Sequence, residues 1–128
     1  MLCMDALEWF SKEKPYDLRA RLFNFACAIT RLAKFLHTQG PLGVVLAAQV
    51  LRSGTSAGAN YEEADDGSSP RDTRAKRQIV LRELKETSFR LRVLRQVGIL
   101  TEVHDPVLGE CAELVKIVAT LLRKSRLA

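Results

Sequence analysis

Residues 51–67 read LRSGTSAGANYEEADDG, and residues 79–94 read IVLRELKETSFRLRVL. The first stretch consists of small residues followed by acidic ones, and the second carries arginine and glutamate on an apolar frame. At helical spacing, both stretches predict helices with one face suited to packing. Glycine inside a helix costs about 1 kcal/mol relative to alanine. We therefore expect Gly54 and Gly58 to allow close contact between these two helices, with polar side chains meeting along their seam.

Composition favours a single helical domain. The chain has 128 residues, of which 47% are hydrophobic, and it contains only four prolines and seven glycines. A chain of this length and apolar content suits one globular domain with one core. Its abundant leucine, alanine, arginine and glutamate favour long helices over short strands. We predict an all-α protein with an N-terminal arm over residues 1–16 and a helical domain over residues 17–128.

The amino end, MLCMDALEWF, does not resemble a secretory signal. Asp5 and Glu8 interrupt its apolar residues, and the basic start of such a signal is missing. Elsewhere no stretch reaches the length of a membrane-spanning helix. We expect a cytoplasmic protein with no membrane partner.

The three cysteines, Cys3, Cys27 and Cys111, are widely spaced and form no CxxC pair. Neither a disulfide framework nor a zinc site is indicated. Cys27 and Cys111 are expected to be small apolar residues on buried helix faces.

Periodicity and stop signals predict four helices. The first covers residues 17–37, and the third covers residues 70–97. The second starts at residue 41 or 42 and ends at residue 65. The fourth starts either at residue 101 or at residues 105–106 and ends at residue 124. Ser69 is a suitable N-cap for the third helix, Pro70 suits its first position, and Gly98 ends it. Because the connections are short, each helix should pack antiparallel to the next, which gives an up-down-up-down four-helix bundle.

The second predicted helix has an inner face made of small and apolar residues. Its members are Leu46, Ala47, Val50, Leu51, Gly54, Ala57, Gly58 and Tyr61.

The N-terminal arm contains the only tryptophan, Trp9, next to Phe10. Two interpretations are open. The arm is either a short helix that docks on the bundle or on a neighbouring subunit, or a frayed terminus with two apolar aromatics.

Three motifs point to a known family. They are RSGTSAGANYEEA at residues 52–64, LRELKET at residues 81–87 and LRVL at residues 91–94. With these motifs the chain resembles the bacterial four-helix-bundle family encoded in intervening sequences of 23S ribosomal RNA genes. The resemblance covers roughly residues 18–122.

This resemblance implies a small cytoplasmic protein that assembles into a ring-like homopentamer and has no established enzymatic activity. Distant relatives are accessory proteins of diversity-generating retroelements, in which a basic pentamer is thought to bind nucleic acid and a reverse transcriptase. The chain is more similar to the intervening-sequence branch than to the retroelement branch.

Positive charge is concentrated in the third predicted helix. The chain has a net charge of +5, and residues 71–95 hold nine basic against three acidic side chains, a net of +6. Seven of the basic residues fall in a sector of roughly 140° at helical spacing. A positive face of this kind suits phosphate backbones of RNA or DNA and does not discriminate sequence. The predicted phosphate contacts are Arg71, Arg74, Arg77, Arg82, Lys85, Arg92 and Arg95.

Other interpretations of this basic sector are open. It can be a solvated face that bridges protomers through acidic partners, or be partly neutralised by the acidic end of the second helix. Phe89 and Leu81 lie in or beside it; we favour a subunit contact for Phe89 over stacking on an unpaired base. The acidic residues are Glu62, Glu63, Asp65 and Asp66.

A polar network is predicted at the seam between the second and third helices. Carboxylates, arginines and short polar side chains line the facing edges, and their pairing would fix register more than it adds stability. The residues are Arg52, Ser56, Asn60 and Glu63 on one helix and Glu83, Glu86 and Arg90 on the other.

Catalytic and metal chemistry receive little support from the sequence. His37 and His104 lie near helix ends without the Glu-x-x-His spacing of a di-iron bundle. Glu83 and Glu86 can act as acid and base in principle, but ion pairing explains them equally well. The SGTSAG run lacks the lysine of a P-loop, and its serines have no histidine nearby in the sequence. We expect no enzyme, no metal and no cofactor.

The sequence therefore predicts a non-enzymatic homo-oligomer, a pentamer by resemblance, that binds the backbone of RNA or DNA through the third helix. The alternative is an oligomeric scaffold or adaptor for another protein, such as a reverse transcriptase or an acidic partner.

Overall fold

The computed structural model describes residue 10, residues 17–67 and residues 69–127, with side chains up to residue 125. Trp9, Cys3 and most of the predicted arm lie outside the described residues. Phe10 is partly buried and packs against the core, which agrees with the docking interpretation at that position.

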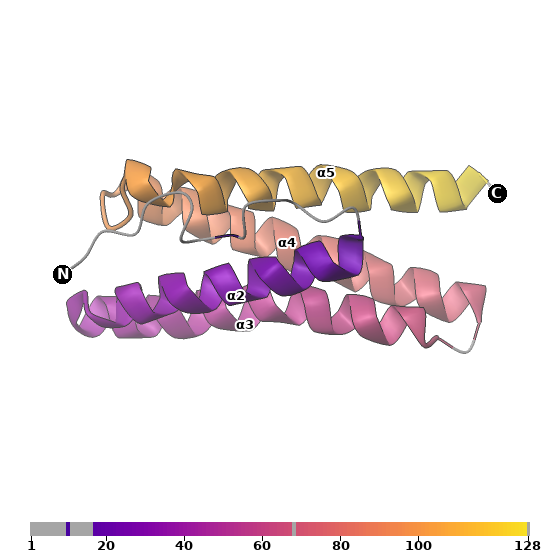
Figure 1. Ribbon diagram of the computed structural model, residues 1–128, viewed down its shortest axis with the longest axis horizontal. Coiled ribbons are helices and arrows are strands. Elements are labelled where there is room, and N and C mark those ends of the chain that lie inside the picture. Colours follow the sequence, from indigo (N-terminus) through magenta and orange to yellow (C-terminus); the bar gives the residue numbers. More distant parts are fainter. Residues whose placement is uncertain (1–9, 11–16, 68, 128) are drawn as a thin grey trace.

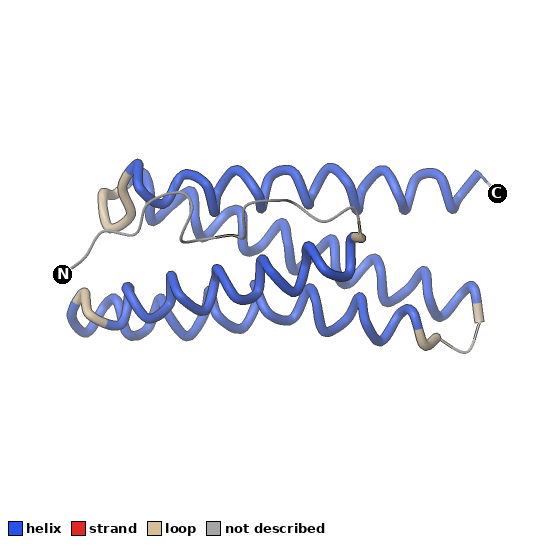
Figure 2. Tube along the Cα trace, viewed as in Figure 1, coloured by secondary structure: helices blue, strands red, loops and turns tan. Residues whose placement is uncertain are grey.

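Four α-helices and one short 3-10 helix make up the described residues, which contain no strand (Figure 2). The helices are α2 (Leu18–His37), α3 (Gly40–Asp65), α4 (Pro70–Gln96) and α5 (Asp105–Leu127), with the 3-10 helix η1 (Glu102–His104) before α5. The α2–α3 turn and the α4–α5 connection lie at one end of the molecule, and the α3–α4 loop lies at the other (Figure 1). The all-α prediction is confirmed.

The helix boundaries follow local chemistry. Asp17 is the N-cap of α2, where its Oδ1 accepts a hydrogen bond from the Arg19 backbone N–H at 3.1 Å. The helix α3 begins at Gly40, one or two residues earlier than predicted. Gly40 has a φ of +82°, which glycine adopts without strain and which lets the chain reverse within two residues.

The start of α4 agrees with the prediction. Ser69 caps it by accepting a hydrogen bond from the Asp72 N–H at 3.1 Å, and Pro70 occupies the first turn. The helix ends at Gln96, and Gly98 with a φ of +83° turns the chain away.

Of the two predicted starts for the last helix, the structure has the later one. Residues 102–104 form η1, and α5 begins at Asp105 and reaches Leu127, beyond the predicted end at 124. The backbone N–H of Thr101 donates to Nδ1 of His104 at 3.0 Å. His104 is buried, and the centre of its ring lies 4.8 Å from the centre of the Phe35 ring. This contact holds the α4–α5 connection against α2.

The core is formed by the facing sides of all four helices. It includes Phe25 and Ile29 from α2 and Leu84 and Leu91 from α4, all fully buried. The predicted inner face of α3 is buried except for Leu46, which is half-buried, and Leu51, which is exposed.

The α3 glycines were predicted to pack against α4, and this helix partner is wrong. Gly54 and Gly58 face α2 rather than α4. A Cβ atom on Gly54 would lie 2.7 Å from Cγ2 of Ile29, and one on Gly58 would lie 3.4 Å from the carbonyl oxygen of Leu22. Glycine at position 54 therefore permits the close approach of α2 and α3, whereas a Cβ at position 58 would make ordinary contact.

No helix in the described part of the chain combines the length and apolar character needed to span a membrane.

Candidate nucleic-acid interface

All seven predicted phosphate-binding residues lie on α4, but they have different surroundings. Four of them are exposed and have no ion pair with any described residue; we call these four the exposed basic row. The other three contact neighbouring helices. The exposed basic row is Arg71, Arg82, Lys85 and Arg92.

Arg74 joins the start of α4 to the end of α5. Its Nη1 donates to the carbonyl oxygen of Leu122 at 2.8 Å and to Oγ of Ser125 at 2.6 Å. The guanidinium is half-buried, and this bonding holds it against α5.

Arg77 turns toward α3. It lies 4.0 Å from a carboxylate oxygen of Asp65, and its guanidinium is 5.6 Å from the centre of the Tyr61 ring. Its Nε is buried and forms no hydrogen bond with a described residue. Arg77 is therefore held in the α3–α4 packing.

Arg95 pairs with the first residue of α5. Its Nε donates to Oδ1 of Asp105 at 2.9 Å. This hydrogen bond raises the pKa of Arg95 and lowers that of Asp105. The pair fixes the α4–α5 connection, so Arg95 is not an open phosphate contact.

The predicted neutralisation by the acidic end of α3 occurs mainly with α2. Arg19 lies 3.3 Å from Glu62 and 3.4 Å from Asp65, whereas on α4 only Arg77 reaches Asp65 among the described residues. These carboxylates therefore do not neutralise the exposed basic row.

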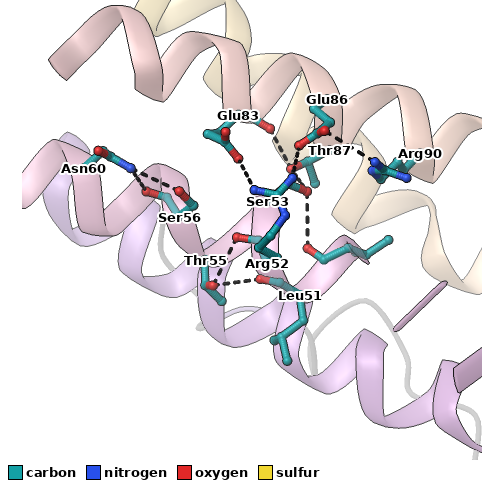
Figure 3. A network of polar contacts seen from close by, with 11 residues as sticks. Leu51, Arg52, Ser53, Thr55, Ser56, Asn60, Glu83, Glu86, Thr87 and Arg90 are labelled. Carbon is teal, nitrogen blue, oxygen red and sulfur yellow. Dashed lines mark hydrogen bonds and ion pairs between the residues drawn. The ribbon is translucent and has the colours of Figure 1, made fainter. Parts of the chain in front are cut away.

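The seam between α3 and α4 holds the predicted ionic network (Figure 3). Arg52 of α3 lies 3.3 Å from Glu83 and 2.6 Å from Glu86 of α4, and Arg90 lies 3.3 Å from Glu86. Arg90 also donates to Oε1 of Gln49 at 2.8 Å. Burial acts to raise the pKa of Glu86, but its hydrogen bonds and charge interactions with Arg52 and Arg90 outweigh that effect and lower it. This part of the prediction is confirmed.

Ser56 and Asn60 do not cross the seam as predicted. The Nδ2 of Asn60 donates to the carbonyl oxygen of Ser56 at 2.9 Å and to its Oγ at 3.0 Å, within α3. The neutral contact across the seam is instead Thr87 to Ser53, with 2.8 Å between hydroxyl oxygens that are both fully buried (Figure 3). Ser53 lies three residues after the buried Val50, and this helical spacing indicates in the sequence that Ser53 is also on the buried face.

A second ion pair, between α2 and α5, was not predicted. Arg21 binds Glu110 through Nε at 3.1 Å and Nη2 at 2.6 Å, and Nη2 also lies 3.1 Å from Glu113. The Glu110 side chain is only 4% exposed. In the sequence, Glu110 falls on the helix face of Val107, Cys111 and Leu114, so a buried partner should have been expected.

Two open grooves are lined by residues of both α4 and α5. The larger, about 780 Å³, is lined by Phe89, Arg92, Val93, Arg95, Gln96, Asp105 and Leu108. The smaller, about 400 Å³, is lined by Lys85, Ser88, Arg92, Ala112, Val115 and Lys116. Lys116 of α5 was not predicted, because the charge pattern along one helix does not show which residues of another helix lie beside it.

Comparison with known proteins identifies the family. Residues 15–120 match the family model of the 23S rRNA-intervening sequence protein. The chain belongs to this family. A crystal structure of a protein of unknown function from the S23 ribosomal protein family of Bacteroides thetaiotaomicron is 31% identical, with a TM-score of 0.77. The match covers 83% of this chain and 98% of that one. No match is found among curated proteins.

The family match confirms the resemblance carried by residues 52–64, 81–87 and 91–94. These segments include the glycines packed on α2 and the ionic seam between α3 and α4. The family motifs in this chain are thus packing motifs.

The histidine, cysteine and acidic side chains are the residues to consider for catalysis or metal binding. Among the described residues, no three His, Cys, Asp or Glu side chains are grouped as metal ligands. Burial lowers the pKa of His104 and raises that of Cys111 to about 12. The Sγ of Cys111 donates to the carbonyl oxygen of Leu84 at 3.4 Å, as expected for a buried thiol, whereas Cys27 is only half-buried.

Proposed function

We propose that the protein is a non-enzymatic, cytoplasmic homo-oligomer that binds the backbone of RNA or DNA through the exposed basic row of α4. Its protomer would be an antiparallel up-down-up-down bundle in a ring-like homopentamer. The observation that supports binding is the contrast within α4. Arg74, Arg77 and Arg95 are engaged by neighbouring helices, whereas the exposed basic row meets no carboxylate among the described residues.

The row has the dimensions of an extended contact. Arg71 and Arg92 are 21 residues apart in one helix, which corresponds to about 30 Å at the α-helical rise. Lysine and arginine along such a length neutralise successive phosphates and release their counterions.

Exposed apolar residues support the oligomer. Leu42 and Val45 on α3 and Val97 beyond α4 are 62%, 56% and 64% exposed. The bond between Gln49 and Arg90 sets the helix register, so Val45 and Val97 lie toward the same end of the α3–α4 pair. An apolar surface of this kind favours contact with another subunit.

The test is the binding of mixed-sequence RNA and DNA at several salt concentrations. The variant is R82E/K85E, and the matched control is K34E/K124E, which makes the same charge change at exposed lysines of α2 and α5. If two phosphate contacts are lost, the negative slope of log K against log salt for duplex DNA should become shallower by about 1.8. Light scattering should show an unchanged oligomer.

Two results would refute the proposal. One is absence of wild-type binding even at low salt, and the other is an equal loss of affinity in the two double variants. A wild-type mass other than that of five protomers would reject the pentamer separately.

An oligomeric scaffold for another protein is the second candidate. The larger groove favours it, because Phe89, Val93 and Leu108 place apolar surface beside Arg92, as an acidic and apolar partner would require. A nuclease-treated pull-down should then retain a stoichiometric protein that R92E, at a residue lining this groove, loses and the control K34E keeps. Retention by both variants would contradict this function.

A further inference from the structure

The smaller groove between α4 and α5 differs from the rest of the surface in its charge. Lys85 and Arg92 from α4 and Lys116 from α5 line it together with the hydroxyl-bearing Ser88. None of its lining residues is acidic. Three cations from two helices therefore face one concave space of about 400 Å³, and such a site attracts an anion more strongly than a single row of charges on a convex helix.

The larger groove adjoins this space through the shared residue Arg92. Phe89 lines it and is 59% exposed, with the Arg92 guanidinium 5.7 Å from the centre of its ring. Asp105 is the acidic residue in its lining, and Arg95 already binds that carboxylate at 2.9 Å. The carboxylate is thus largely compensated, and the combined surface is cationic beside an aromatic ring.

We propose that the two grooves together form a subsite for one nucleotide of a single-stranded nucleic acid. The phosphate lies against Lys85, Arg92 and Lys116, and the base stacks on Phe89. This subsite rests on the proposed function and adds to it a preference for unpaired over duplex nucleic acid.

The preference follows from the chemistry of the ring. Phe89 lies one helical turn after Lys85 and three residues before Arg92, so the ring and both cations share one side of α4. Only an unpaired base can offer its face to a side chain on a helix surface, whereas a base in a duplex is covered by its neighbours. Stacking accepts any base, because every base has a π-face.

The same features argue against Phe89 as a contact between subunits. A copy covering Phe89 would bury Lys85 and Arg92 unless it brought carboxylates to them. Glu83, Glu86 and Asp105 are already bound by arginines within the chain, so those carboxylates would have to come from elsewhere, such as Glu63 or Asp66 at the end of α3. The exposed apolar residues Leu42, Val45 and Val97 offer a subunit contact away from these cations.

The experiment compares a short oligothymidylate with a duplex of the same length by fluorescence anisotropy on the full chain. F89L keeps apolar volume and removes the aromatic ring, and K116Q removes one charge. The matched controls are F23L, at an α2 phenylalanine that is 60% exposed, and K34Q, at an exposed α2 lysine.

F89L should weaken oligothymidylate binding about tenfold and leave duplex binding nearly unchanged. K116Q should make the negative slope of log K against log salt for the oligothymidylate shallower by about 0.7, the contribution of one phosphate on a single strand. F23L and K34Q should match the wild type.

Different results separate the two proposals. If the wild type binds neither probe at low salt, the proposed function fails and the subsite with it. If the wild type binds and R82E/K85E does not, while F89L and K116Q match their controls, the subsite alone is refuted. An equal effect of F89L on both probes would overturn the single-strand preference, and a changed oligomer mass in F89L would make Phe89 a subunit contact.

Discussion

Replacing Gly54 with alanine tests the packing of α2 on α3 most directly. The added Cβ would lie 2.7 Å from Cγ2 and 2.9 Å from Cγ1 of Ile29. Ile29 is fully buried in the core, so its side chain can move only if neighbouring core residues move with it. Overpacking of this kind costs about 1–3 kcal/mol, while the higher helix propensity of alanine returns about 1 kcal/mol.

Two other helical glycines serve as graded controls for this substitution. An added Cβ on Gly109 of α5 meets nothing within 4 Å, so G109A should stabilise the protein by about 1 kcal/mol. An added Cβ on Gly58 would make ordinary contact at 3.4 Å, so G58A should lie between the two. The difference between G54A and G109A removes the propensity effect and should equal the overpacking cost of about 1–3 kcal/mol.

The assay is urea unfolding followed by circular dichroism. All variants are compared at one protein concentration, because subunit association stabilises the folded chain by mass action. Adding I29A should partly relieve G54A, since it removes Cγ1 and Cγ2, and the double-mutant cycle should give a favourable coupling of about 0.5–3 kcal/mol. Equal stabilities of G54A and G109A, or additive effects of G54A and I29A, would refute the close-packing argument.

Two further predictions concern buried ionisable side chains, Glu110 and His104. R21L should destabilise the protein by about 3–5 kcal/mol in urea unfolding, because it leaves the buried Glu110 carboxylate without this guanidinium. R19L removes two exposed ion pairs, with Glu62 and Asp65, and should cost about 1 kcal/mol or less. Similar losses in the two variants would contradict the difference in burial. Burial lowers the pKa of His104 in the folded state, with Asp105 acting to raise it and Arg95 to lower it. The unfolded chain therefore takes up the proton first, and stability should fall as pH drops below about 6.5. H104Q should show a smaller fall in Tm between about pH 7 and pH 5, and parallel curves would exclude His104 as the cause.

Much of the fold is encoded locally and could be predicted. Ser69 and Pro70 mark the start of α4, and Gly98 follows its end, because capping and turn geometry depend on only a few neighbouring residues. The start of α3 was predicted at residue 41 or 42, yet the helix already includes Gly40. Its positive φ lets one residue end a turn and begin a helix, and the sequence pattern does not distinguish those roles.

Pairing between helices was harder to predict. The charged partners of the seam were found because Arg52 and Glu86 are long, complementary side chains on facing edges. The partner of Gly54 was assigned to the wrong helix, since a small residue indicates close approach without saying from which side. Arg21 and Glu110 are 89 residues apart and their pairing depends on how the first and last helices meet, which no local pattern contains.

In the candidate interface too, the sequence pattern of one helix did not show which cations contact neighbouring helices. A helical wheel places Arg74, Arg77 and Arg95 in the same sector as Arg92, because it records only the angle around one axis. Within the bundle, α4 has α3 on one flank and α5 on the other, and the long arginine side chain can reach either neighbour. Arg77 accordingly contacts α3, while Arg74 and Arg95 contact α5.

The exposed basic row consists of the predicted α4 cations that bond to neither α3 nor α5, and Lys116 shows that a neighbouring helix can add to them. The cationic surface therefore belongs to the α4–α5 pair rather than to one helix. In a ring-like homopentamer the repeated feature would then be a groove with an aromatic ring beside it, so five separate and equivalent sites would result in place of a continuous positive band. A strand bound in this way would contact the ring at intervals, with its affinity set by how many grooves its length can reach.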